Sequence, residues 1–535
     1  MRRSLVLLLA GVTLSVFLRL LPTVVTGYPV SVDAWPLVES ADVLCRHSDV
    51  RIWDDQRLDS YNNKWPFTIL LGALTSKVLG THPLHTLRIL VPAINGLAAV
   101  VVVLLVSLYC PSRVSGYISA LVYGCAASIV VFTSGVAKEV LAHYFFFLLL
   151  WLVSSEVRGV RSLFLLALLS VSLVLTHHMT SFMFFGVSLA ILLMKALCWV
   201  LGRSDPPPPA MTLAPFAAFM LASVHYVFWG RYGFKLSLTY SEAFTLAMYS
   251  LAFFSVPVIF EFRGQPRVLR GLSTSVRVAV EFLLLVVAAV LTLSSTRLYL
   301  VAGRQTVTAV DAIIYGFSFM APLLLIGAYE GPKDLSVWRF LLGPWLAFVL
   351  SVIAFPVFTG NPFFTSVLHR LFNFLMMALA LFFGVVVYEL GRGLTSKLLV
   401  SISLILIVLT GVAAQVRALS PLNESSFYRV HHGYEVEGFK VIAGFCERGA
   451  SIVGGAKVSY FYTLYPLSVN TGRAVILALR GKAPPRGSLV VLSRDNLEKG
   501  VVVSLDVNRF TREGLNRLGD MDKVFGNGYV YAYRV

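Results

Sequence analysis

The chain has 535 residues, of which 57% are hydrophobic and 13% are charged. Apolar runs of about 20 residues recur along it, the length that crosses a bilayer as a helix, so we expect a polytopic membrane protein rather than a soluble one. The net charge of +17 does not predict nucleic-acid binding, because Lys and Arg gather in short loops between the apolar runs, as membrane topology requires. The five cysteines contain no CxxC pair, which excludes a zinc knuckle and a redox dithiol.

The first apolar run, Ser4–Val25, follows Met1-Arg2-Arg3 and begins like a secretory signal peptide. No small-residue cleavage site follows the run, and residues 20–25 extend it to the length of a membrane-spanning helix. We therefore expect a first membrane helix that is retained in the protein rather than cleaved from it.

A polar loop, Tyr28–Lys64, follows this helix and concentrates ionisable groups in a chain that has few of them. It contains Asp33, Glu39, Asp42, Asp49, Asp54, Asp55, Asp59 and Lys64. Asp33 stands just after the first span, so we expect its carboxylate at the bilayer surface. The following stretch, Trp65–Gly80, is apolar but about sixteen residues long and contains Lys77, which favours an interfacial or re-entrant helix over a full span.

Further apolar runs bring the predicted number of membrane helices to thirteen. After the first, we place them at residues 84–109, 114–133, 139–155, 162–177, 179–201, 211–229, 243–260, 277–295, 309–328, 339–358, 371–390 and 397–416. With the N-terminus inside the cell, every inner loop is then basic, as the positive-inside rule demands. The same topology places the first external loop, residues 28–80, and the C-terminal residues outside the cytoplasm, in a multi-pass protein of the cell membrane.

The composition changes after Arg417, which divides the chain into a membrane domain, 1–417, and a domain of mixed polar and apolar sequence, 418–535. We expect a small extracytoplasmic α/β domain. Its predicted elements are helices at 434–446 and 509–518, strands at 451–455 and 488–493, and a hairpin within 523–535. Cys45 and Cys446 both face the exterior in this topology and are candidates for a disulfide.

Several of these features occur together in a known superfamily. An N-terminal helix is followed by Asp33 at the start of an acidic external loop, and Lys64-Trp65-Pro66 then leads an apolar helix to Gly80. This order resembles the membrane-embedded GT-C glycosyltransferases, which include dolichyl-phosphate-mannose protein mannosyltransferases, lipid A aminoarabinose transferases and catalytic subunits of oligosaccharyltransferases. Thirteen spans with an extracytoplasmic C-terminal domain are similar to the architecture of several members, and residues 524–531 resemble the C-termini of prokaryotic ones.

The resemblance implies a function: transfer of a sugar from a polyprenyl-phosphate donor to a protein, lipid or glycan acceptor on the outer face of the membrane. Asp33 matches the first-loop acid that such enzymes use as general base, and Lys64 falls where some members contact the lipid phosphate. Glu139 matches the acid that opens the second external loop, which is commonly Asp in the family. The Trp-Trp-Asp signature of oligosaccharyltransferases is absent from the C-terminal domain, so we do not expect transfer of whole oligosaccharides to asparagine.

The chemistry of such a transfer requires a carboxylate that activates the acceptor and cations that stabilise the departing phosphate. Asp33 and Glu139 are the predicted catalytic carboxylates. The predicted contacts of the substrate are Lys64, Lys138, His177, His178, Arg304, His369 and Arg370. The sequence assigns no metal site, and a divalent cation such as Mg²⁺ or Mn²⁺ stays an open expectation.

Each of these residues also has a structural interpretation. Asp33 could cap an interfacial helix, Lys64 could snorkel to the interface, and Arg370 could anchor the end of a span. For Asp54 and Asp55 we favour the interpretation that they are solvated charges of a loop. For the whole chain, a lipid-linked-sugar transporter or flippase would show inverted repeats and midplane charges, whereas here we find no repeat and the charges collect at the outer face. A non-catalytic membrane scaffold would need neither Asp33 nor Glu139.

Overall fold

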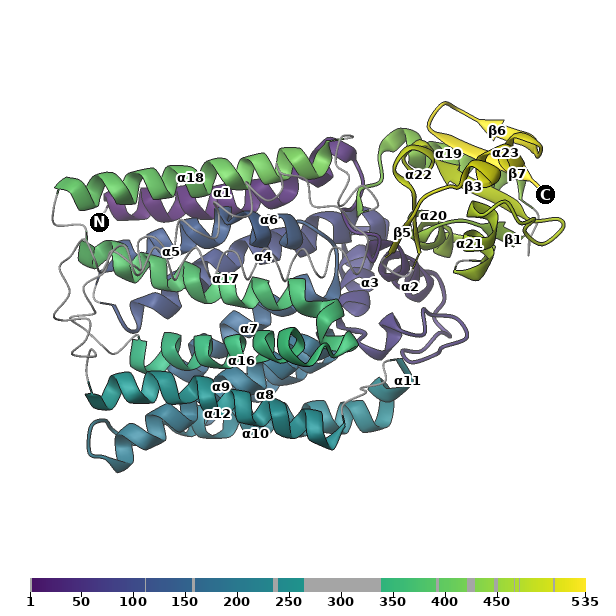
Figure 1. Ribbon diagram of the computed structural model, residues 1–535. Helices are drawn as coiled ribbons and strands as arrows, with labels where there is room; N and C mark the ends of the chain where they lie inside the picture. The colour runs from purple at the N-terminus through teal and green to yellow at the C-terminus, as the bar shows by residue number, and fades with distance from the viewer. Residues whose placement is uncertain are drawn as a thin grey trace.

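The computed structural model describes residues 2–110, 112–155, 159–233, 239–263, 338–390, 394–420, 429–446, 451–465, 467–470, 472–503 and 506–535. Among these residues, long apolar helices run side by side, and a smaller region of strands and short helices lies at one end of them (Figure 1). Eight of the described helices are long and apolar enough to cross a membrane, or nine if one bent pair counts as a single span. The chain is therefore a multi-pass membrane protein.

Most of the described residues of the membrane region are helical. The helices are α1 (Arg2–Thr26), α4 (Pro83–Ser107), α5 (Arg113–Cys125), α6 (Ala127–Thr133), α7 (Lys138–Ser154), α8 (Val160–Thr176), α9 (His178–Val200), α10 (Pro209–His225), α11 (Arg231–Gly233), α12 (Tyr240–Arg263), α16 (Gly343–Thr359), α17 (Pro362–Leu390) and α18 (Leu394–Leu419). Two π-helical turns, η2 (Tyr226–Gly230) and η3 (Trp338–Leu342), join α10 to α11 and precede α16. The predicted spans at 277–295 and 309–328 lie outside the described residues, so the total of thirteen stays a prediction.

Two predicted spans differ from the structure within the described residues. The prediction of one helix over 114–133 is wrong, because α5 and α6 are bent by 63° at Ala126, whose ψ of 123° leaves the helical region. The helix predicted at 371–390 begins earlier, at Pro362. Proline is favourable in the first turn of a helix, where its missing N–H is not needed. Arg370 interrupts the apolar run but lies within α17, where its guanidinium pairs with the carboxylate of Glu139.

The first external loop contains two helices, α2 (Ala34–Arg46) and α3 (Phe67–Leu79), with a 3₁₀ turn, η1 (Asn62–Lys64), between them. The helix α3 is apolar and too short to be a full span, as predicted for this stretch. The helix α2 was not predicted. Its buried side chains recur at the spacing of one helical face and pack against α3 and α4; they are Ala34, Leu37, Val38 and Ala41. This packing gives the residue before α2, Asp33, a rigid support.

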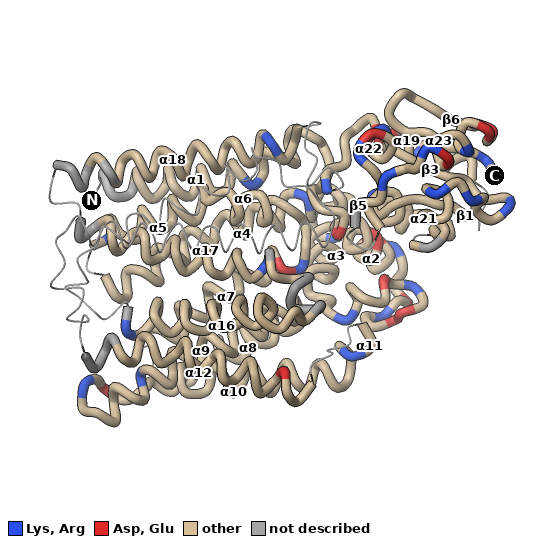
Figure 2. The backbone as a smooth tube through the Cα atoms, viewed as in Figure 1, with Lys and Arg blue, Asp and Glu red and all other residues tan. Residues whose placement is uncertain are grey.

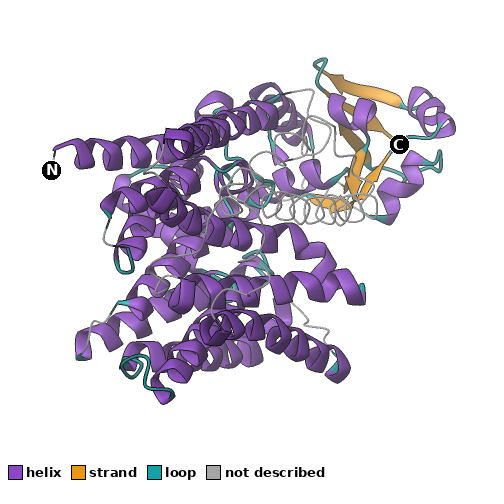
Figure 3. Cartoon of the chain, turned by 60° about the vertical axis from the view of Figure 1, so that its left-hand side comes forward, coloured by secondary structure: helices purple, strands orange, loops and turns teal. Residues whose placement is uncertain are grey.

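The C-terminal region contains helices α19 (Gly433–Phe445), α20 (Ala456–Phe461), α21 (Arg473–Leu479), α22 (Arg494–Lys499) and α23 (Arg512–Gly519), with a 3₁₀ turn, η5 (Tyr462–Leu464). Its strands are β1 (Ser451–Val453), β2 (Ser468–Asn470), β3 (Leu489–Ser493), β4 (Val501–Val503), β5 (Asp506–Asn508), β6 (Asp522–Gly526) and β7 (Val530–Arg534). Five strands form a mixed sheet in the order β2-β1-β3-β7-β6, and β4 pairs with β5 (Figure 3). The predicted helices, strands and hairpin correspond in position to α19, α23, β1, β3 and β6–β7. The placement of this region outside the cytoplasm stays a prediction.

The C-terminal region packs directly on the first external loop. Trp35 of α2 is only 1% exposed, and its ring lies edge-on to those of His431 and Phe461, at 5.0 Å between centroids in each case. Burial holds the pKa of His431 well below its usual range, so the neutral ring accepts a hydrogen bond from Trp35 Nε1 through Nδ1, at 3.1 Å. The predicted candidate pair, Cys45 and Cys446, is not bonded: both thiols are free.

Charged residues gather where the membrane helices end beside α2, α3 and the C-terminal region, whereas the long helices are almost free of them (Figure 2). This distribution agrees with a polar end of the helices at a membrane surface.

We predict that this charged end lies outside the cytoplasm. In a variant without native cysteines, the exposed residues Ser60 and Asn516, changed singly to Cys, should react with a membrane-impermeant maleimide in intact cells. Asp205, exposed in the connection between α9 and α10, is the matched inner site, and Asp205→Cys should react only after the cells are lysed. Protection at Ser60→Cys and Asn516→Cys together with labelling at Asp205→Cys would reverse the orientation.

Candidate functional site

Two chain segments meet at the charged end of the membrane helices. The segment after α1 and the segment after α6 pair in parallel at Val30 and Gly135, and the Val136 amide donates a hydrogen bond of 2.9 Å to the Val30 carbonyl. Asp33 follows the first segment and Glu139 follows the second. This joint therefore brings the two predicted catalytic carboxylates to the same end of the bundle.

Glu139 lies in the first turn of α7 and is only 2% exposed. Its carboxylate faces a cation, because Arg370 of α17 places Nη1 3.0 Å from Oε2. Two imidazoles lie farther away: His143 Nε2 is 3.7 Å from Oε1, and His177 Nε2 is 3.9 Å from Oε2. The Thr180 amide donates to His177 Nδ1, so the neutral ring carries its hydrogen on Nε2, toward Glu139. Glu139 is thus a buried carboxylate held by one arginine and flanked by two histidines.

Asp33 is partly exposed and stands at the N-cap position of α2. Its side chain makes no capping hydrogen bond there, which removes the structural interpretation of this residue as a helix cap. The charge of Asp33 acts on both Lys138 and Arg370. Ser31, two residues earlier, has a φ of 87°, a conformation that non-glycine residues seldom adopt outside constrained sites. The backbone before Asp33 is therefore held in one strained shape.

Lys138 is 6% exposed and lies against two aromatic rings, with Nζ 3.9 Å from the centroid of Tyr61 and 4.9 Å from that of Trp65. Within the described part of the chain its ammonium group makes no hydrogen bond. Desolvation, opposed by Arg370 and aided by Asp33, raises the pKa of Tyr61 to about 12, so the phenol stays neutral beside the cation. Cation–π contact places the ammonium but leaves its three donors available to an anion.

Lys64 is also buried, at 4% exposure, and pairs with the carboxylate of Asp55. Burial contradicts the snorkelling interpretation of Lys64, whereas Asp55 keeps 42% of its side-chain surface exposed, as its loop-charge interpretation expects. His178 contacts Trp65, with 4.7 Å between ring centroids. Arg304 and the side chain of His369 lie outside the described residues.

Sequence reasoning missed two residues of this site, His143 and Tyr61. Glu139 and His143 are four residues apart on one helix, so their shared face could have been recognised from spacing alone. Tyr61 lies in an irregular loop, and no pattern in the sequence distinguishes it from its neighbours. Of the predicted residues, the structure brings Asp33, Lys138, Glu139, His177 and Arg370 together.

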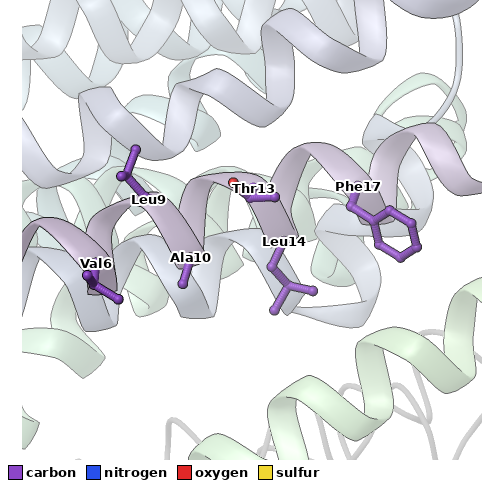
Figure 4. Close-up of a pocket in the computed structure, with 6 residues that line it drawn as sticks. All are labelled: Val6, Leu9, Ala10, Thr13, Leu14 and Phe17. Atoms are coloured by element: carbon purple, nitrogen blue, oxygen red, sulfur yellow. The ribbon is translucent and has the colours of Figure 1, made fainter.

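A separate hollow of about 510 Å³ lies along α1 (Figure 4). Its lining is Val6, Leu9, Ala10, Thr13, Leu14 and Phe17. This lining contains no ionisable group and offers only apolar surface, as expected where a membrane helix faces acyl chains. The ionisable groups described above gather instead around Glu139.

The fold of this polytopic membrane protein is similar to those of two solved Archaeoglobus fulgidus oligosaccharyltransferase structures. An Archaeoglobus fulgidus oligosaccharyltransferase in complex with Zn and sulfate matches over 99% of this chain and 73% of its own, with a TM-score of 0.54 and 12% identity. The Archaeoglobus fulgidus oligosaccharyltransferase AglB, in complex with an inhibitory peptide and a dolichol-phosphate, matches over 92% and 69%, with a TM-score of 0.51 and 12% identity. The predicted resemblance to GT-C enzymes is thereby confirmed at the level of the fold.

A third similar structure is ArnT from Cupriavidus metallidurans bound to undecaprenyl phosphate, which matches over 99% of this chain and 97% of its own at 14% identity. The TM-score of this match is 0.40. No protein-family model matches the chain, and no curated protein does.

The zinc ion in the first of these structures raises the question of a metal here. Among the described residues, no group of three His, Cys, Asp or Glu side chains is arranged to hold a metal ion. The carboxylate best placed to do so, Glu139, already faces the guanidinium of Arg370 at 3.0 Å, and a cation there would be repelled. The described residues around Glu139 therefore do not fit a divalent metal ion.

Glu39 of α2 titrates at an unusually high pH for a carboxyl group. It is partly buried, and desolvation raises its pKa from 4.5 to about 7, although Ser40 donates a hydrogen bond to its carboxylate. Between these two pH values the folded protein binds more protons at Glu39 than the unfolded chain does. The free energy of unfolding contributed by this group is therefore highest below about pH 4.5 and falls as the pH rises toward 7.

We predict that Glu39→Gln raises the melting temperature of the detergent-solubilised protein at pH 8 and leaves it nearly unchanged at pH 4.5. The amide keeps the size of the side chain but needs no desolvated charge. Asp54→Asn, at a partly exposed position of the same loop, is the control and should show no such dependence on pH. Equal melting shifts for Glu39→Gln at both pH values would contradict the raised pKa.

Proposed function

We propose that this protein is a membrane glycosyltransferase that moves a sugar, of hexosyl type, from a polyprenyl-phosphate-linked donor to a protein, lipid or glycan acceptor on the outer face of the membrane. The observation that carries this proposal is one cluster within a GT-C fold: the partly exposed Asp33 beside the cations Lys138 and Arg370, with Glu139 buried behind them. Such a cluster has one carboxylate that a substrate can reach and two cations for its phosphate.

The two carboxylates have different environments, so we assign them different tasks. Asp33 is partly exposed, and its side chain makes no capping hydrogen bond to α2. Such a carboxylate suits a general base that accepts a proton from the acceptor. Glu139, at 2% exposure, is enclosed and paired, which suits a residue that orients Arg370 rather than one that meets the acceptor. Glu139 is thus a positioning residue in this mechanism.

The cations are suited to a phosphate. The side chain of Arg370 keeps 30% of its surface exposed, and its Nε, although buried, makes no hydrogen bond within the described residues, so the guanidinium has a donor left for a ligand. The ammonium group of Lys138 likewise has donors to offer. An arginine fork and a lysine point charge together can hold a phosphate that gains negative charge as the sugar leaves.

The transfer then proceeds by one exchange of bonds. An acceptor hydroxyl or amine attacks the anomeric carbon of the sugar, and the bond from that carbon to the phosphate oxygen breaks. The phosphate leaves with the bonding electrons, stabilised by Arg370 and Lys138, while the acceptor proton passes to Asp33. The dolichol-phosphate that occupies the solved AglB structure supports a lipid phosphate as the carrier here.

A lipid-linked-sugar transporter and a non-catalytic scaffold would also use many membrane helices. Neither requires an accessible carboxylate next to two cations at one membrane surface. No observation in the described residues favours either over the transferase.

We predict that Asp33→Asn lowers sugar transfer by about 10²–10⁴-fold, the usual contribution of a general base. The substitution keeps the size of the side chain and removes only its charge, so expression and melting in detergent should stay close to the parent. Transfer is measured in membranes supplied with radiolabelled dolichyl- and undecaprenyl-phosphate sugars. Asp54→Asn, at a partly exposed acid of the same loop, should transfer at the parent rate.

Parent-level transfer by Asp33→Asn would make Asp33 structural and end its assignment as the base. Absence of transfer by the parent protein from every donor in the panel would instead favour the transporter or scaffold.

We also predict that Lys138→Met raises KM for the lipid-phosphate donor by about tenfold and lowers kcat as well, because the phosphate loses a contact both when the donor is bound and when the sugar leaves. Methionine keeps an apolar stem between Tyr61 and Trp65. Lys77→Met, at an exposed position of α3, is the matched control and should leave both constants near the parent values. An unchanged KM in Lys138→Met would show that this ammonium group does not bind the donor.

A further inference from the structure

An arginine lies fully buried within the first membrane helix, apart from the cluster described above. Arg19 of α1 has 0% exposure. Its Nη1 donates to the Ser15 hydroxyl at 2.8 Å and the Gly124 carbonyl at 3.2 Å, and its Nε donates to Asn95 Oδ1 at 3.1 Å. Nη2 lies 3.4 Å from the Tyr123 carbonyl. These contacts are all with neutral oxygens, and no carboxylate among the described residues pairs with Arg19.

The backbone carbonyls that accept hydrogen bonds from Arg19 lie at the break between α5 and α6. Tyr123 and Gly124 lie in the last turn of α5, where the bend at Ala126 leaves carbonyl groups without partners in their own helix. The C-terminus of a helix carries partial negative charge, which a cation stabilises. In an apolar surrounding such carbonyls must be satisfied by the protein itself. Arg19 thus stabilises the break, and the break needs Arg19.

A close approach of three helices allows this contact. The helices α1, α4 and α5 pack against one another (Figure 1). A Cβ atom on Gly96 of α4 would lie 2.8 Å from the Val16 Cα, and one on Gly124 would lie 3.0 Å from the Ser15 Cβ. Larger residues at Gly96 or Gly124 would push the helices apart, and the guanidinium of Arg19 would lose its acceptors.

A second side chain connects Arg19 to the site. Asn95 accepts from Arg19 and from the Tyr123 hydroxyl, at 2.8 Å, through Oδ1, and its Nδ2 donates to the Val140 carbonyl at 2.8 Å. Val140 follows Glu139 in the first turn of α7. The amide of Asn95 can make these contacts in only one orientation, because Arg19 fixes which end is the acceptor. The break and the first turn of α7 are therefore held by one network.

We propose that Arg19 is a positioning residue for the transfer reaction: together with Asn95 it holds the broken helix α5–α6 against the start of α7 and so fixes the place of Glu139 and its partner Arg370. This inference rests on the proposed function. It predicts that a small change in the network reduces the rate of the chemical step while the donor still binds.

The informative variants keep the protein folded. Arg19→Lys keeps the charge but cannot reach Asn95 and both carbonyls at once. Asn95→Asp keeps the acceptor for Arg19 and forms an ion pair with it, but loses the donor to Val140. Ser351→Ala, which removes a partly buried contact between α12 and α16, is the control outside the network of Arg19. Arg19→Met leaves the carbonyls unsatisfied, so we expect it to fold poorly and do not rely on it.

Two measurements test the proposal. With the radiolabelled dolichyl- and undecaprenyl-phosphate sugars as donors, well below each variant's melting temperature, Arg19→Lys and Asn95→Asp should lower kcat by about tenfold and leave KM for the donor within about twofold. Hydrogen exchange followed by mass spectrometry should show faster exchange over residues 134–141, which include the Val136 amide bonded to Val30. Ser351→Ala should match the parent in both measurements.

The outcomes separate this proposal from the proposed function. Parent-level kcat in both variants, with only a lower melting temperature, would make the network a purely structural one and overturn the proposal. If the parent transfers no sugar from any donor, the proposed function fails, and hydrogen exchange alone decides. Faster exchange over 134–141 would then support the positioning of α7 by Arg19, and unchanged exchange would overturn it.

Discussion

A carboxylate enclosed among apolar helices is stable only where a cation meets it, since removing one partner of such a pair leaves an uncompensated charge. Glu139 satisfies this condition through Arg370, and the contact joins the first turn of α7 to α17 across much of the chain. The segment before α7 is in turn paired with the segment before α2, so the position of Asp33 depends on the same joint. The ion pair therefore organises the polar end of the bundle and leaves Asp33 as the carboxylate that faces outward.

The membrane region accommodates its buried charges in two different ways. Glu139 and Arg370 neutralise each other near the surface, whereas Arg19, within a span, is surrounded by carbonyl and amide oxygens. The second arrangement works because a bent helix exposes carbonyl groups that have no water to bond. A helix break and an intramembrane arginine, each unfavourable alone, become favourable together. The arrangement also explains how a bend can persist at Ala126 without proline or glycine at that position.

The sequence predicts where most of the described helices of the membrane region lie, because a long apolar run has few alternatives. Loop charge and family resemblance also predict that Asp33 and Glu139 lie at one surface. Neither predicts that Arg370 pairs with Glu139, since only the packing of α7 on α17 brings them together. The sequence does not predict the buried position of Arg19 for another reason: a hydropathy average over an apolar run is hardly changed by one arginine. The helix α2 is not predicted because acidic residues alternate in the sequence with the apolar residues that pack on α3 and α4.

The packing of Trp35 against His431 and Phe461 has a consequence for how proteins of this architecture can diverge. A loop of the membrane region and the C-terminal region share one apolar core, and that core lies two residues from Asp33. Replacing the C-terminal region with one from another protein would leave the indole N–H without its acceptor and the ring in water. The two regions are therefore not interchangeable modules, and substitutions around Trp35 in one region require compensating substitutions in the other.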